Sequence, residues 1–121
     1  MTTPPPLFGR DEALNMLGGD EGLLADVVNI AREELPRQIA SFKTALDAED
    51  APTARRHAHT LKGTVATLGA SQVKDSAFEA ECAARDGSLA SARQIYLTLD
   101  ELVRRLVSEL DAYASRRLTA G

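Results

Sequence analysis

The sequence predicts an all-α protein, an antiparallel up-down-up-down four-helix bundle with a short extra helix at its N-terminus. The composition favours helices, because aromatic residues make up only 4% of the 121 residues and tryptophan is absent, whereas β-sandwiches and barrels depend on aromatic and β-branched residues. Apolar residues recur at steps of three and four in four separate segments, which is the spacing of one face of a helix. The short turns between these segments require neighbouring helices to run antiparallel.

The two ends of the chain are expected to lie outside this bundle. Residues 1–9 contain three consecutive prolines and are predicted to be a flexible lead-in. A short helix is predicted over Asp11–Leu17, and the two glycines that follow end it. The bundle itself is expected over residues 10–114, and residues 115–121 are polar and expected to fray.

The second predicted helix is long and spans Asp20–Glu49, with Asp20 as its N-cap. Its apolar stripe keeps one phase over the whole length and comprises Leu24, Val28, Ala31, Leu35, Ile39, Phe42 and Leu46. Pro36 lies within this stripe and removes one backbone donor, which costs about 3 kcal/mol in an ordinary helix. Because the stripe keeps its phase through the proline, the sequence predicts one kinked helix rather than two helices.

Three further helices are predicted in the rest of the chain. The third extends over Asp50–Gly69, with Pro52 in its first turn. The fourth is expected to begin with Ser71 as its N-cap and to end at the Asp86-Gly87 turn, and the fifth is expected to begin with Ser88 as its cap. The residues predicted to be buried in these three helices are Ala54, Ala58, Leu61, Val65, Leu68, Val73, Ala77, Ala80, Ala84, Ala92, Tyr96, Leu99, Val103, Leu106, Leu110 and Tyr113.

Charge and hydropathy exclude several classes of function. The net charge of −4 means that the whole molecule repels nucleic acid and anionic membranes. No run of about 18 apolar residues is present, so no transmembrane segment is expected, and the first residues lack the apolar core of a signal peptide. Cys82 is the single cysteine, so no disulfide forms within the chain. The sequence therefore predicts a cytoplasmic protein that binds neither nucleic acid nor membrane. We expect this protein to be a monomer.

The outward face of the third helix has an unusual composition. Residues 51–70 contain three basic side chains and no carboxylate, which creates a local positive patch around His59 on a protein of negative net charge. The residues that share the side of His59, at offsets of −4, −3, +3, +4 and +7, are Arg55, Arg56, Lys62, Gly63 and Ala66.

Gly63 is the most informative residue of this face. A glycine inside a helix costs about 1 kcal/mol relative to alanine, and a side chain four positions after a histidine would lie over the imidazole. The missing side chain therefore leaves His59 open to a large partner. The alternative is that Gly63 lets another helix approach closely or is merely tolerated.

Helix pairing gives His59 a candidate partner. The chain turns around Gly69–Ser71, so positions on the third and fourth helices face each other when their numbers sum to about 140. His59 is then opposite Glu81, whose carboxylate would accept the Nδ1 proton and leave Nε2 as the outward nucleophile. The alternative is a solvated Glu81, or one paired with Arg85 four residues later.

Residues 58–70, with the sequence AHTLKGTVATLGA, resemble the histidine box of histidine phosphotransfer (HPt) domains, whose pattern is A-H-x-L-K-G-x-x-x-x-L-G-A. Every specified position of that pattern matches. The segments Phe8–Asp20, Glu34–Pro36 and Phe78–Glu81 are also similar to the family, so the resemblance covers nearly the whole chain.

The resemblance implies a relay protein of two-component phosphorelays that carries a phosphohistidine. His59 would be phosphorylated on Nε2 and would exchange the phosphoryl group with an aspartate on a response-regulator receiver domain, in a pathway that begins at a histidine kinase. Lys62 would hold a phosphate oxygen, Gly63 would give clearance and Glu81 would orient the imidazole, although some family members carry glutamine at this last position. The surface that docks the receiver is expected to include Arg55, Arg56, Ala66 and Arg85.

The resemblance also implies that the chain is not itself an enzyme. Neither G-x-x-x-x-G-K-[ST] nor G-x-G-x-x-G occurs in the sequence, so no ATP site or autokinase activity is expected. No cofactor or metal is expected on this chain, because Mg²⁺ would be bound by the acidic pocket of the receiver. His57 lies on another side of the helix from His59, so the two cannot chelate one metal ion.

Two alternatives remain open at this point. The chain would fit the phosphoacceptor segment of a larger histidine kinase, either a hybrid sensor or a chemotaxis-type kinase. It would also fit a binding-only domain that docks receivers without phosphotransfer, although the intact His59, Lys62 and Gly63 argue against that function.

Overall fold

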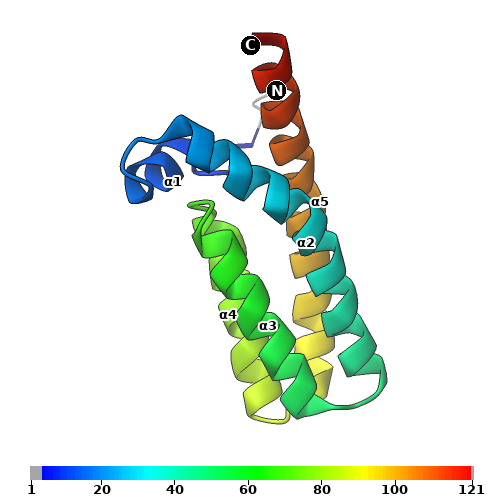
Figure 1. Cartoon of the computed structure of the whole chain (residues 1–121). Coiled ribbons are helices and arrows are strands. Elements are labelled where there is room, and N and C mark those ends of the chain that lie inside the picture. The colour runs from blue at the N-terminus through cyan, green and yellow to red at the C-terminus, as the bar shows by residue number, and fades with distance from the viewer. Residues whose placement is uncertain (1–3, 121) are drawn as a thin grey trace.

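The computed structural model describes residues 4–120, and the side chains of residues 4–118. Its helices, in chain order, are α1 (Arg10–Met16), α2 (Glu21–Asp47), α3 (Ala51–Ala66), α4 (Ser71–Arg85) and α5 (Leu89–Ala120). α3 packs against α2 and α4, and α5 packs against the same two helices. Figure 1 shows α3, α4, α5 and the second half of α2 along one long axis, with α1 at one end of the bundle. The prediction of an all-α bundle with an extra N-terminal helix is confirmed.

Two aspartates begin the helices on which the site depends. A carboxylate oxygen of Asp20 accepts a hydrogen bond from the Leu23 N–H at 3.0 Å, and one of Asp50 accepts from the Thr53 N–H at 3.2 Å. Each cap satisfies a backbone donor that has no partner within the helix. Both caps were predicted from the sequence.

The predicted cap of α4 is wrong. Ser71 is the first residue of the helix, Ala70 is the N-cap, and the cap makes no side-chain hydrogen bond. The chain reverses at Gly69, whose φ is +60°, and the Ser71 N–H already donates to the Gly69 carbonyl at 3.1 Å. The turn is thus tighter than a Ser71 cap would require.

α2 is a single helix that continues through Pro36. Figure 1 shows it bending midway along its length, so that its first half reaches toward α1 and its second half lies along the bundle. A kinked single helix is what the uninterrupted apolar stripe predicted, and every residue of that stripe is buried. The bend is the usual consequence of a proline inside a helix.

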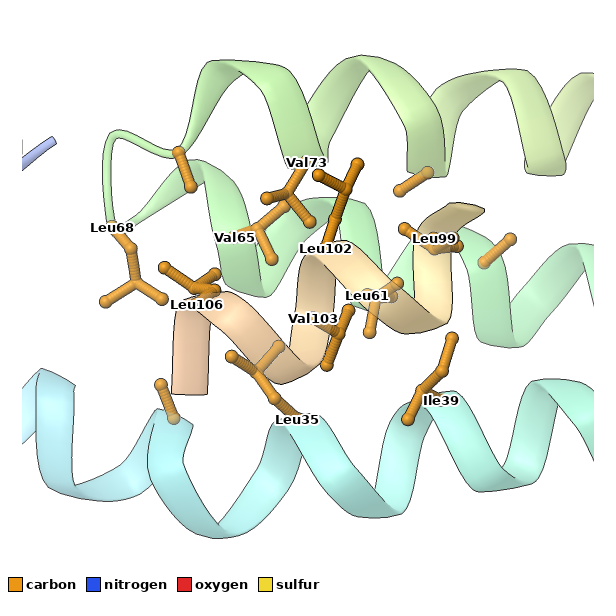
Figure 2. Close-up of a cluster of buried hydrophobic side chains, with 14 of the residues drawn as sticks. Leu35, Ile39, Leu61, Val65, Leu68, Val73, Leu99, Leu102, Val103 and Leu106 are labelled. Carbon is orange, nitrogen blue, oxygen red and sulfur yellow. The ribbon is translucent and has the colours of Figure 1, made fainter. Parts of the chain in front are cut away.

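The core forms where the four long helices meet. Figure 2 shows apolar side chains packed between the helices, from α2 (Leu35 and Ile39), α3 (Leu61 and Val65), the turn after α3 (Leu68), α4 (Val73) and α5 (Leu99, Leu102, Val103 and Leu106). No polar or charged side chain is buried in the part of the chain that the structure describes. Tyr96 was predicted to be buried but is only half-buried. Its ring packs against that of Phe42, with 6.3 Å between the ring centres.

The chain ends are more extensively packed than the sequence predicts. Leu7 and Phe8, placed in the flexible lead-in, are buried, and their N–H groups donate to the two carboxylate oxygens of Glu109 at 3.0 and 2.9 Å. α5 continues to Ala120 instead of fraying after residue 114, because no glycine or proline interrupts it. Arg117 also reaches Glu21 at 3.7 Å. The predicted lead-in of residues 1–3 and the last residue of the predicted tail lie outside the described residues.

Candidate functional site

His59 lies midway along α3 and points away from the core. Its neighbours Ala58 and Leu61 are fully buried, so the packing of α3 fixes the rotation of the helix about its axis. The His59 side chain is 66% exposed as a result. A histidine held in this way is open to a reaction partner.

One carboxylate from α4 contacts two side chains of α3. Oε2 of Glu81 lies 3.0 Å from Nδ1 of His59, and Oε1 lies 2.7 Å from Nζ of Lys62. The predicted contact between His59 and Glu81 is therefore confirmed. The alternative pairing of Glu81 with Arg85 does not form, since Arg85 pairs with Asp86 at 3.1 Å.

The charge state of Glu81 determines which ring nitrogen carries the proton. Burial of the Glu81 side chain raises its pKa, but the hydrogen bonds and positive charges of Lys62 and His59 lower it further, so that the pKa lies below its ordinary value of 4.5. An ionised carboxylate only accepts hydrogen bonds. In the neutral imidazole Nδ1 therefore carries the proton and Nε2 has a free lone pair.

Lys62 is held between two groups of α4. Besides its ion pair with Glu81, its Nζ lies 5.0 Å from the centre of the Phe78 ring, within the range of a cation–π interaction. Phe78 had no predicted role. The sequence feature that could have pointed to Phe78 is an aromatic side chain outside the buried stripe of α4, three residues before Glu81.

The space next to Gly63 is open. A Cβ atom added there would meet no heavy atom within 4 Å outside its own helix backbone. The alternative that Gly63 permits the close approach of another helix is therefore wrong. The missing side chain leaves room beside His59.

Two hollows meet at His59, and they differ in chemistry. The larger, about 500 Å³, is here called the α2 groove. It is lined by Leu17, Val27, Ile30, Ala31, His59, Thr60, Gly63, Thr64 and Thr67. The second, about 360 Å³, is here called the basic hollow. It is lined by Pro52, Arg55, Arg56, His59 and Glu81.

The four predicted docking residues are not all gathered at one place. Arg55 and Arg56 are exposed and line the basic hollow with His59. Ala66 is half-buried and Arg85 is exposed, and neither lines a hollow that includes His59. Ile30, which is 62% exposed and lines the α2 groove, was not predicted to belong to the site. Its signal was an isoleucine outside the buried stripe of α2.

Two further findings concern metal ions and membranes. Among the described residues, no group of three or more His, Cys, Asp or Glu side chains is arranged as a metal site. None of the described helices is long and apolar enough to cross a membrane.

Comparisons with known proteins agree with this geometry. The structure resembles the crystal structure of histidine-containing phosphotransfer protein B (HptB) from Pseudomonas aeruginosa PAO1 with a TM-score of 0.85, over 93% of this chain and 98% of that one, at 20% sequence identity. At that identity the likeness shows the fold. A search of the curated proteins finds no match. The family model of the Hpt domain, however, matches residues 26–112. The chain therefore belongs to the Hpt domain family, the phosphotransfer domains of phosphorelay signalling.

Proposed function

We propose that His59 is the phosphoacceptor of this Hpt domain and that it exchanges a phosphoryl group with an aspartate of a response-regulator receiver domain. One observation carries the proposal: the Nδ1 atom of His59 is 3.0 Å from the ionised Glu81, while the His59 side chain is 66% exposed. The hydrogen bond leaves Nε2 as the nucleophilic atom and directs it away from the carboxylate.

The proposed transfer needs only the imidazole and the phosphorylated partner. The Nε2 lone pair attacks the phosphorus of the aspartyl phosphate, an N–P bond forms, and the P–O bond to the aspartate breaks as the carboxylate leaves with its electron pair. Nδ1 keeps its proton, so the ring gains a positive charge opposite the Glu81 carboxylate. That carboxylate stabilises the charged ring. The reverse transfer uses the same groups.

The proposed partner supplies what this chain does not. A receiver domain would contribute the reacting aspartate and would bind Mg²⁺ in its own acidic pocket, and a histidine kinase would be the source of the phosphoryl group. Gly63 would leave room for the receiver beside the ring. We propose that this exchange takes place in the cytoplasm, on a monomer without a cofactor of its own.

The docking surface would extend to both sides of His59. The α2 groove offers apolar contacts, including the exposed Ile30. On the other side, Arg55, Arg56 and Arg85 would attract the acidic pocket of a receiver, with Ala66 at the edge of the contact. Charges arranged in this way act mainly on the rate of association.

The test is incubation of the full chain with a panel of ³²P-phosphorylated receiver domains. We expect acid-labile label on the wild type and none on His59→Gln, with the helical circular dichroism of both proteins unchanged. His57→Gln is the matched control, because it removes a half-buried imidazole two residues away, and it should accept label normally. Label that persists on His59→Gln would assign the phosphoacceptor elsewhere. Receiver binding without any labelling would indicate a docking domain instead.

A further inference from the structure

The cation that lies closest to the Glu81 carboxylate is already engaged. Nζ of Lys62 is 2.7 Å from one oxygen of Glu81, and the other oxygen is 3.0 Å from Nδ1 of His59. Lys62 therefore lies on the Nδ1 side of the imidazole. To reach a phosphoryl group on Nε2, it would have to leave a carboxylate whose side chain is only 13% exposed. The negative charge of a phosphoryl group on Nε2 therefore needs a different cation as its partner.

Helix geometry identifies which residue lies on the Nε2 side. A helix advances about 100° per residue, so Lys62 lies about 60° to one side of His59 and Arg56 about 60° to the other. α4 is on the side of Lys62, because it supplies both groups that Lys62 contacts. Arg56 is therefore on the flank of α3 opposite Lys62. Because Glu81 holds Nδ1, the Nε2 atom on the other side of the imidazole ring is turned away from that carboxylate. Arg55, in contrast, lies about 40° from His59 around the helix axis, on the side of Lys62.

Arg56 also lies beside His59 at the surface, and its charge is available. Helical side chains lean toward the N-terminus of their helix, so the ring of His59 leans over the turn that carries Arg56. Both residues line the basic hollow. Arg56 is exposed and makes no ion pair within the described residues. The carboxylate of Asp50, whose pKa it helps to lower, is hydrogen-bonded to the Thr53 hydroxyl at 2.7 Å.

We infer that Arg56 binds the phosphoryl oxygens of phospho-His59 in the basic hollow, and that Lys62 is a positioning residue for Glu81. A guanidinium suits this task, because its planar fork can donate two parallel hydrogen bonds to a phosphoryl group. The inference rests on the proposed function, since it requires a phosphoryl group on His59. The inference goes beyond the proposed function, because it assigns Arg56 to the Nε2 side of the imidazole and Lys62 to the Nδ1 side.

The test uses phosphoramidate, a small N-phosphoryl donor, so that no docking surface takes part. Nε2 attacks its phosphorus and the donor nitrogen leaves as ammonia. The full chain is compared as wild type, Arg56→Gln, Arg56→Lys and Arg55→Gln. The last variant is the matched control, because it removes one positive charge from the same hollow on the Lys62 side. The readouts are the labelling rate, the half-life of the phosphohistidine, and a ³¹P NMR titration of the phosphoryl group.

We expect Arg56→Gln to slow labelling about tenfold, as the loss of a charge-assisted hydrogen bond predicts. Arg56→Lys should lie between that variant and the wild type, and Arg55→Gln should stay within about twofold of the wild type, as the loss of one exposed, screened charge predicts. The titration of the phosphoryl group should move to higher pH in Arg56→Gln alone, because a nearby cation favours the dianion.

Other results would overturn the inference. Equal effects of Arg55→Gln and Arg56→Gln would show a general field of positive charge instead of a contact, and a wild-type rate in Arg56→Gln would show no contact at all. In both cases label confined to His59 would leave the proposed function intact. Label on His59→Gln, or no label on the wild type, would remove the proposed function and this inference with it.

Discussion

At the scale of single residues, Glu81 connects the chemistry of His59 to the fold. Its carboxylate is mostly buried at the α3–α4 contact, where its oxygens lie 3.0 Å from Nδ1 of His59 and 2.7 Å from Nζ of Lys62. An unpaired carboxylate at this position would repel an incoming phosphoryl group. Lys62 offsets that charge, so Glu81 can orient the imidazole at a smaller electrostatic cost to the transfer.

The lowered pKa of Glu81 predicts how stability depends on pH. Because Lys62 and His59 hold the pKa of folded Glu81 below its ordinary value of 4.5, the folded state favours the ionised form. This stabilisation is fully present above the pKa of the unfolded chain and is lost as pH falls through the folded pKa. Glu81→Gln should unfold about 1–3 kcal/mol more easily at pH 7, the range for losing a hydrogen bond to a charged partner. The difference from the wild type should then shrink as the pH falls through 4.5 and below.

Urea unfolding at several pH values measures this difference. Glu79→Gln is the matched control, because Glu79 is exposed on the same helix and its removal should change stability little at any pH. A gap between Glu81→Gln and the wild type that stays constant down to pH 3 would show that the Glu81 charge does not stabilise the fold.

At the scale of the elements, the turn between α3 and α4 is tied to the segment before α1. The Gly9 N–H donates to the Leu68 carbonyl at 3.0 Å. The backbones approach so closely that a Cβ atom on Gly9 would lie 2.9 Å from the carbonyl carbon of Gly69. Since this turn sets the register of α3 against α4, the contact supports the pairing of His59 with Glu81.

Two glycine substitutions should therefore have opposite effects on stability. Gly9→Ala should destabilise the protein by about 1–3 kcal/mol, because the new methyl group would press on backbone that cannot rotate away. Gly63→Ala should stabilise it by up to about 1 kcal/mol, because its Cβ would enter open space within a helix. Thermal unfolding followed by circular dichroism compares the two. A Gly9→Ala protein as stable as the wild type would mean that the segment before α1 contributes nothing to the turn.

At the scale of the whole molecule, the sequence predicts what depends on local pattern. The apolar stripes located all the long helices, because burial of one helix face is visible in the spacing of its residues. The pairing of His59 with Glu81 followed from a short turn, because such a turn fixes which positions face each other. The hydrogen bonds of Leu7 and Phe8 to Glu109 could not be found in this way, since they join residues about a hundred positions apart and depend on how the ends of the bundle pack.

The parts of the site that the sequence analysis missed come from the same limit. Phe78 and Ile30 lie outside the buried stripes of their helices, but an exposed apolar side chain is common at a protein surface, and the local pattern does not show what it contacts. Only the assembled bundle shows that one lies under Lys62 and the other beside His59. An exposed apolar residue outside the buried stripe can therefore be assigned to the site only when its position relative to the reacting group is known.

The arrangement of the whole bundle predicts which exposed apolar side chain a receiver contacts. Ile30 lines the α2 groove together with His59. Leu97, in contrast, is on α5, which packs against α2 and α4, and it does not line that groove. The two are equally exposed, at 62% and 63%, so Ile30→Ser and Leu97→Ser should both change stability by less than about 0.5 kcal/mol. Ile30→Ser should raise the Kd for a receiver that phosphorylates the wild type about tenfold, as for a residue near the centre of an interface. Leu97→Ser should leave that Kd unchanged.

Labelling of both variants by phosphoramidate should match the wild type, because that reaction needs no docking. Equal losses of receiver binding in the two variants, measured by calorimetry, would show that the α2 groove is not where the receiver docks.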